Sequence, residues 1–161
     1  MTIIITVLIL LIILSIFLIT KCNNSYRTAS GRMYRCRDAK TAECLDFLRL
    51  ISIDLTYNIR EDYGKLLRKK LQNTSFIELF GIDPRILGWN YDKGREIGIK
   101  MYKITGASMQ TEEIIHTLFH ELAHSMTKEM QHPPGGEWEY IDGYLQTFAL
   151  KHVKIYNLKK K

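Results

Sequence analysis

The sequence predicts a small α+β domain preceded by one apolar helix. Three observations support this prediction: residues 2–20 are apolar without interruption by charge, residues 41–72 and 111–152 carry apolar residues at helical spacing, and the stretch between them alternates like short strands. With 161 residues, the chain has room for one domain and an appendage. We therefore expect a short β-sheet packed on helices, with a separate N-terminal segment.

The N-terminal segment reads TIIITVLILLIILSIFLIT and covers residues 2–20. A helix needs about 20 apolar residues to cross a bilayer core. The segment lacks the basic start and the small-residue cleavage site of a signal peptide. We interpret residues 1–20 as a transmembrane anchor, and the chain as a single-pass membrane protein.

Basic residues are concentrated on either side of the domain. Residues 21–40 carry six Lys or Arg against one Asp, and residues 151–161 carry five Lys and no acidic residue. Because cations that follow an apolar span tend to stay in the cytosol, we expect a cytosolic domain whose basic flanks contact anionic lipid. Nucleic acid is a weaker candidate partner for the same cations. The chain is accordingly divided into the anchor, a basic juxtamembrane linker (residues 21–40), the domain (residues 41–152) and a basic tail (residues 153–161).

The elements of the domain follow from its periodicity. Helices are expected over residues 41–58 and 61–72, and short strands over FIELF (76–80), RILGW (85–89) and residues 96–101, with a polar turn at 90–94. A helix over residues 111–130 comes next, the prolines and glycines of QHPPGG end it, and a last helix covers residues 137–152. The sheet is expected to be mixed or antiparallel and to lie against the helix at 111–130.

The helix at residues 111–130 carries the most informative motif. His120, Glu121 and His124 read H-E-x-x-H, and residues four apart share one helix face, so the two imidazoles can bind one metal ion. Zinc is the favoured ion, because zinc with three protein ligands keeps an open position and lowers the pKa of a water there to about 7. Glu121 would take the proton of that water and pass it to a leaving amine. The alternative is an amphipathic helix that carries the pattern by chance.

A third ligand has to come from the residues after this helix. His132 is the first candidate, because the PPGG turn can return its ring to the metal; Glu139 and Asp142 are carboxylate alternatives, and Asp142 can equally orient a histidine ring. His116 lies one turn before His120, and three histidines in line along a helix span about 12 Å. We therefore expect His116 to line the cleft or to support a ligand.

Two blocks of sequence point to a family. ILGWNYDKGREIGIKMY (residues 86–102) and IIHTLFHELAH (residues 114–124) resemble, in content and order, the WLM family of zinc metalloproteases, which are relatives of the SprT-like DNA–protein crosslink proteases. The resemblance implies a zincin-like fold, hydrolysis of protein substrates, His120, His124 and His132 as metal ligands, and Glu121 as the catalytic residue. One departure is the segment before His132, which is longer than the family's usual G-P-H.

The sequence thus predicts a membrane-anchored zinc metallopeptidase that acts on a protein or peptide substrate. Two alternatives remain open at this point. One is a membrane-tethered, metal-containing binding module without turnover. The other is a DNA-dependent protease that acts on DNA–protein crosslinks.

Overall fold

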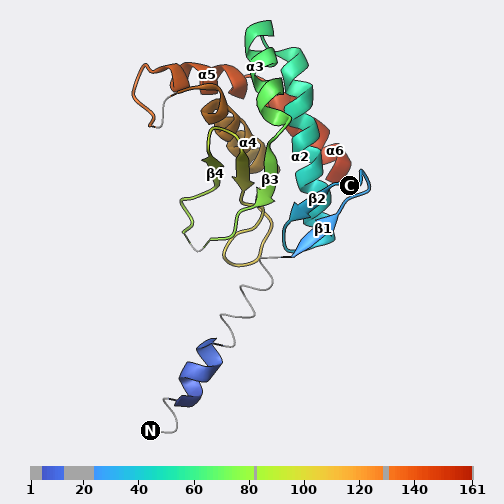
Figure 1. Cartoon of the computed structure of the whole chain (residues 1–161), viewed down its shortest axis with the longest axis vertical. Coiled ribbons are helices and arrows are strands. Elements are labelled where there is room, and N and C mark those ends of the chain that lie inside the picture. The colour runs from blue at the N-terminus through green and yellow to red at the C-terminus, as the bar shows by residue number, and fades with distance from the viewer. Residues whose placement is uncertain (1–4, 13–23, 82, 129–130, 161) are drawn as a thin grey trace.

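The computed structural model describes residues 5–12, 24–81, 83–128 and 131–160, with the side chains up to residue 154. The described residues form a mixed α+β fold with small sheets and helices, which confirms the α+β part of the predicted fold class (Figure 1). Helix α4 (Thr111–Met126) lies at the centre, between the larger sheet and the C-terminal helices. Its apolar face, with Leu118, Phe119 and Leu122, is fully buried.

Two helices precede the sheet and lie close to their predicted positions. Helix α2 (Ala39–Asn58) begins at Asp38, whose carboxylate accepts a hydrogen bond of 2.7 Å from the backbone N–H of Thr41. This contact satisfies one of the N–H groups that a helix start leaves without a partner. Leu45, Leu48 and Leu55 recur on one face of α2 and are fully buried. Helix α3 (Glu61–Leu71) follows α2 and packs against it.

The larger sheet is mixed, as expected, and has the strand order β3-β5-β4. Strand β3 (Ser75–Glu78) runs parallel to β5 (Glu96–Ile99), and β4 (Gly88–Tyr91) runs antiparallel to β5 with Trp89 opposite Gly98. The turn from β4 to β5 contains three residues with positive φ: Asp92 at 48°, Lys93 at 52° and Gly94 at 97°. Strand β4 forms one edge of this sheet and lies beside α4.

The basic segment before α2, which was predicted to be a linker, is folded where the structure describes it, from residue 24 onward. Strands β1 (Ser25–Arg27) and β2 (Met33–Arg35) form an antiparallel hairpin, and Gly31 at φ 82° lies in its turn. Tyr34 is 4% exposed, and its hydroxyl donates a 2.6 Å hydrogen bond to Asp46 of α2. Arg37 forms an ion pair of 2.6 Å with Glu78, which is 1% exposed. The buried contacts of Tyr34 and the ion pair of Arg37 therefore hold this segment against the rest of the domain.

Two predicted helix ends also differ from the structure. Helix α4 ends at Met126 rather than at residue 130, because Thr127 adopts an extended conformation. The last predicted helix is divided into α5 (Glu137–Gln146) and α6 (Ala149–Lys160). At the break, the hydroxyl of Thr147 donates to the carbonyl of Tyr144 at 2.7 Å, a local bond of the kind that competes with helix continuation.

The prediction of a single-pass membrane protein is corrected by the structure. Within the described ranges, no helix combines the length and the apolar composition that crossing a membrane requires. Residues 5–12 of the predicted anchor are described and helical, and its other residues, 1–4 and 13–20, lie outside the described residues. The cytosolic orientation and the lipid contacts were inferred from the anchor, so they are not supported either. The domain boundaries remain a prediction.

Candidate metal centre

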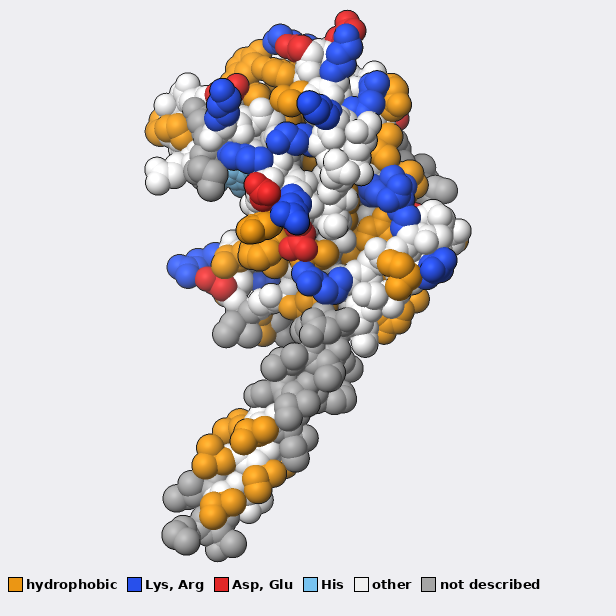
Figure 2. Space-filling model, viewed as in Figure 1, with side chains coloured by type: hydrophobic (Ala, Val, Ile, Leu, Met, Phe, Trp, Pro, Cys, Tyr) orange, Lys and Arg blue, Asp and Glu red, His pale blue; other side chains and the backbone are white. Residues whose placement is uncertain are grey.

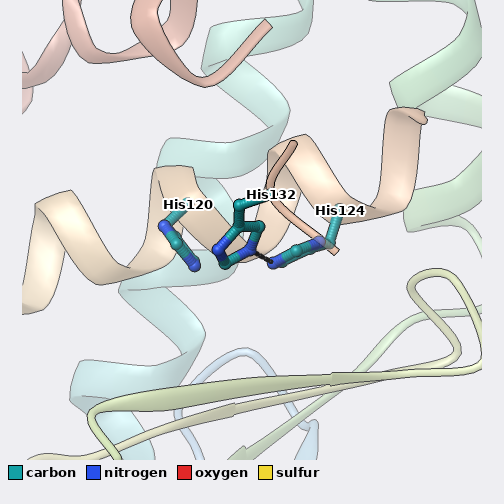
Figure 3. Close-up of side chains that lie close together, drawn as sticks. All are labelled: His120, His124 and His132. Atoms are coloured by element: carbon teal, nitrogen blue, oxygen red, sulfur yellow. Dashed lines mark hydrogen bonds between the residues drawn. The ribbon is translucent and has the colours of Figure 1, made fainter. Parts of the chain in front are cut away.

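Three histidine rings meet beside α4. His120 and His124 project from consecutive turns of α4, and His132 comes from the segment between α4 and α5 (Figure 3). Each offers a ring nitrogen, and these nitrogens all lie within 4.8 Å of one another. The Nε2 atoms of His124 and His132 are 2.9 Å apart. The structure therefore brings together the three histidines that the sequence singled out.

The carboxylate alternatives for the third ligand are held elsewhere. Glu139 is exposed and accepts a hydrogen bond of 2.6 Å from the backbone N–H of Gly135. Asp142 accepts a 3.0 Å hydrogen bond from the side-chain amide of Gln146. Among the described residues, neither carboxylate belongs to the group of side chains that can hold a metal ion.

The indole of Trp138 packs against all three histidines. Its ring centroid lies 3.9 Å from that of His132, 4.8 Å from that of His120 and 5.3 Å from that of His124. Trp138 stands on the first turn of α5 and is 8% exposed. In the sequence, Trp138 lies within the last predicted helix, and no role at the metal is predicted for it. Its contact with the histidines depends on the chain reversal between α4 and α5, which no local pattern encodes.

The surroundings of the histidines favour uncharged rings. Burial lowers the pKa of His120 below its usual value; the negative charge of Asp142 acts against this lowering, and His132 adds to it. Burial lowers the pKa of His124 to about 4, with further lowering by His120, His132 and Lys93. A neutral imidazole has a free lone pair, which is the form that binds a metal ion. Three converging imidazoles are thus a donor set that fits a divalent cation such as zinc.

Glu121 lies beside the histidines with its carboxyl group against the backbone of β4. The side chain is 5% exposed, and burial followed by the negative charge of Asp142 raises the pKa of Glu121 to about 7. A Cβ atom at Gly88 would lie only 2.6 Å from Oε1 of Glu121 and from Cγ2 of Thr117. Glycine at position 88 therefore lets β4 approach α4 closely at the residue with the proposed proton-transfer role.

Asn90 and Gly94 fix the turn after β4 to α4. The amide of Asn90 donates to the carbonyl oxygen of Glu121 at 2.5 Å and to the hydroxyl of Ser125 at 2.7 Å, and its oxygen accepts from the N–H of Gly94 at 2.7 Å. A Cβ atom at Gly94 would lie 2.6 Å from Oγ of Ser125. The sequence placed these residues in the block that resembles the family, but their individual roles appear only in the structure.

A groove between β4 and α4 runs past Glu121. It consists of two cavities of about 460 Å³ each, which share Gly88, His120 and Glu121. One of the two, which we call the Lys93 cavity, is further lined by Trp89, Asn90, Asp92, Lys93, His124 and His132. The other, which we call the His116 cavity, is further lined by Arg85, Ile86, Leu87, His116, Thr117 and Gln146. Figure 2 shows a hollow on the visible face of the molecule with histidine at its margin.

A comparison with protein families identifies the domain. The model of the WLM domain matches residues 51–132, just over half of the chain. The chain belongs to the WLM family. The matched segment contains His120, Glu121 and His124 and ends at His132. WLM proteases are metalloproteases, and the three histidines of this WLM domain form a group that can hold a metal ion.

Two solved structures are similar to this WLM chain. One is the crystal structure of Wss1 from Saccharomyces cerevisiae, with 19% identity and a TM-score of 0.39 over 56% of this chain and 82% of that chain. The other is a Wss1 mutant from the same organism, with 18% identity and a TM-score of 0.39 over 56% of this chain and 83% of that chain. No curated protein matches the chain.

Proposed function

We propose that this WLM domain is a zinc-dependent peptidase in which His120, His124 and His132 hold the ion. The observation that carries the proposal is the meeting of three histidines with the buried carboxyl group of Glu121 in one groove. When bound, zinc supplies Lewis-acid chemistry, in that it polarises a carbonyl and lowers the pKa of water to about 7. The three imidazoles leave a position open on an ion that prefers four ligands.

Glu121 is the proposed proton-transfer residue. Glu121 lines both cavities of the groove. A peptide bond bound there would place both the attacking water and the leaving amine within reach of its carboxyl group. The side chain of Glu121 is buried, and the hydrogen bond from Asn90 to its carbonyl oxygen holds the backbone of Glu121 in place. Glu121 would accept a proton from water and donate it to the amine nitrogen as the peptide bond breaks.

Strand β4 is the proposed support for the peptide substrate. It is an edge strand of the sheet, and three of its residues, Gly88, Trp89 and Asn90, line the groove beside the histidines. An edge strand presents backbone N–H and C=O groups that an extended peptide can pair with. The expected substrate is therefore an extended or unfolded stretch of protein.

The first experiment measures metal content and peptidase activity on the full chain. Glu121→Gln should keep the zinc content of the wild type and lower kcat by at least about 100-fold on an unfolded protein substrate. His132→Ala should lower zinc affinity, whereas Glu139→Gln and Asp142→Asn should leave the zinc stoichiometry unchanged. Undiminished cleavage by Glu121→Gln would exclude the proposed role of this residue.

The same assay separates the two alternatives. Zinc binding without cleavage of any substrate would support a binding module that lacks turnover. Cleavage that requires added DNA and weakens as salt rises would support a DNA-dependent protease, because salt screens contacts with phosphates. Cleavage that is independent of DNA supports the peptidase as proposed.

A further inference from the structure

His116 occupies a position in the groove that the proposed zinc site does not use. It lies on α4 one turn before His120, is exposed, and lines the His116 cavity next to Glu121. Its Nδ1 atom lies 2.6 Å from Oε1 of Gln146 on α5. Among the described residues, no group forms a hydrogen bond with the other ring nitrogen, Nε2.

The contacts of Gln146 determine which nitrogen of His116 carries the proton. The Nε2 atom of Gln146 lies 3.1 Å from the backbone carbonyl oxygen of His116 and 3.0 Å from Oδ1 of Asp142, and a carbonyl or an ionised carboxylate only accepts. The amide NH₂ must therefore face these two oxygens, which leaves the amide oxygen facing His116. Because that oxygen also only accepts, Nδ1 of His116 is the protonated nitrogen. In the neutral ring, Nε2 is then a hydrogen-bond acceptor.

The other groups of the His116 cavity offer apolar surface and few free donors. Ile86 and Leu87 are apolar. The guanidinium of Arg85 donates to the carboxylate of Asp83 at 2.8 Å and 3.0 Å. The hydroxyl of Thr117 donates to the backbone carbonyl of Glu113 at 2.6 Å. Apart from His120 and Glu121, which belong to the proposed metal and proton-transfer site, the cavity thus combines apolar walls with an acceptor, Nε2 of His116, that has no hydrogen-bond partner within the described part of the chain.

We propose that the His116 cavity is a substrate subsite that selects a side chain with an apolar body and a hydrogen-bond donor at its tip, such as tyrosine. His116 is the residue that sets this specificity, by accepting the donor at Nε2, and Gln146 positions it by fixing its tautomer. The inference rests on the proposed peptidase function, because the cavity adjoins Glu121. A phenylalanine side chain would fit the apolar walls but would leave the acceptor without a partner.

The test compares peptides that differ only in tyrosine or phenylalanine, placed in turn at each position on both sides of the cleaved bond. On the full-length, zinc-loaded protein, one position on one side should favour tyrosine by about three- to tenfold in kcat/KM, the range expected for one partly exposed hydrogen bond. His116→Phe should bring the tyrosine-to-phenylalanine ratio to about one at that position. Since the result is a ratio, a general loss of activity in the variant does not affect it.

A second measurement does not depend on turnover. The ¹⁵N NMR signals of the His116 ring should show a protonated Nδ1 and an unprotonated Nε2, and Gln146→Leu should produce a mixture of both tautomers together with a smaller tyrosine preference. Peptide affinities for Glu121→Gln provide the same comparison without cleavage, so a failure of catalysis can be distinguished from a failure of the subsite. An Nε2-protonated ring, or equal affinity for both peptides at every position, would overturn the inference.

Discussion

The ring of Trp138 lies nearly parallel to the ring of His132, with centroids 3.9 Å apart and an interplanar angle of 27°. A residue of α5 thus supports the one proposed metal ligand that lies outside α4. Residues that orient a ligand in this way affect metal affinity even though they do not touch the ion.

Trp138→Leu is expected to weaken zinc binding by about tenfold, because α5 keeps an apolar residue while His132 loses its stacking partner. Competition with a chromophoric chelator measures the dissociation constant. The matched control is Tyr140→Leu, two residues further along α5 at a side chain that is 61% exposed. Equal affinities of the two variants would show that stacking on His132 contributes nothing to metal binding.

Gly88→Ala is expected to lower kcat/KM by about 100-fold, since a Cβ atom there displaces the carboxyl group of Glu121 and small displacements of reacting groups are costly. Zinc content should stay at the wild-type level, because the histidines are not displaced. Gly81→Ala is the control, since a Cβ atom at position 81 has no atom within 4 Å. Full activity in Gly88→Ala would show that the position of the Glu121 carboxylate does not matter for catalysis.

Asn90→Asp is expected to lower the free energy of unfolding by about 2 kcal/mol, because the carbonyl of Glu121 and the hydroxyl of Ser125 lose a donor and face a negative charge. Urea unfolding followed by circular dichroism measures this change. Asn73→Asp, at an exposed position after α3, should change the free energy by no more than about 0.5 kcal/mol. Similar values for both substitutions would mean that the turn after β4 is not held by Asn90.

The hairpin should contribute stability that depends on pH through Asp46. Burial acts to raise the pKa of Asp46, but hydrogen bonds from Tyr34, Ser30 and Arg49 outweigh it, so the pKa is lowered in the folded protein. The unfolded chain then binds the proton more readily, and the contribution is present above about pH 4 and is lost as the pH falls through the lowered value.

Asp46→Asn should therefore reduce the loss of unfolding free energy between neutral pH and pH values below about 4, as measured by urea unfolding at a series of pH values. Glu112→Gln, at an exposed position on α4, is the control, and its unfolding free energy should depend on pH as that of the wild type does. An identical pH dependence in wild type and Asp46→Asn would show that Asp46 does not contribute to the pH dependence of stability.

Sequence reasoning succeeded where the information is local. His120 and His124 share a helix face because four residues span about one turn, and the surrounding apolar residues place that helix in the core. The first and last short strands before the helix were also recognisable from the sequence, but the middle strand begins at Gly88 and continues to Tyr91, into the residues predicted as a turn. In the larger sheet, however, the parallel pairing of β3 with β5 depends on a contact across about twenty residues.

The structural features that were missed depend on contacts between distant parts of the chain. The hairpin at residues 25–35 lies among basic residues, and burial of Tyr34 requires Asp46 of α2 as a partner. The role of Trp138 requires α5 to fold back over α4. The predicted anchor was inferred from apolar composition alone, and of its residues the structure describes 5–12, which are helical.

The proposed ligands differ in how the chain brings them together. His120 and His124 become neighbours as soon as one turn of α4 forms, but His132 joins them only when the connection between α4 and α5 has closed, at an entropic cost that grows slowly with its length. A chain with α4 formed and α5 not yet docked would hold an ion through two nitrogens and release it quickly. The residence time of zinc would therefore report how completely the C-terminal half of the domain has folded.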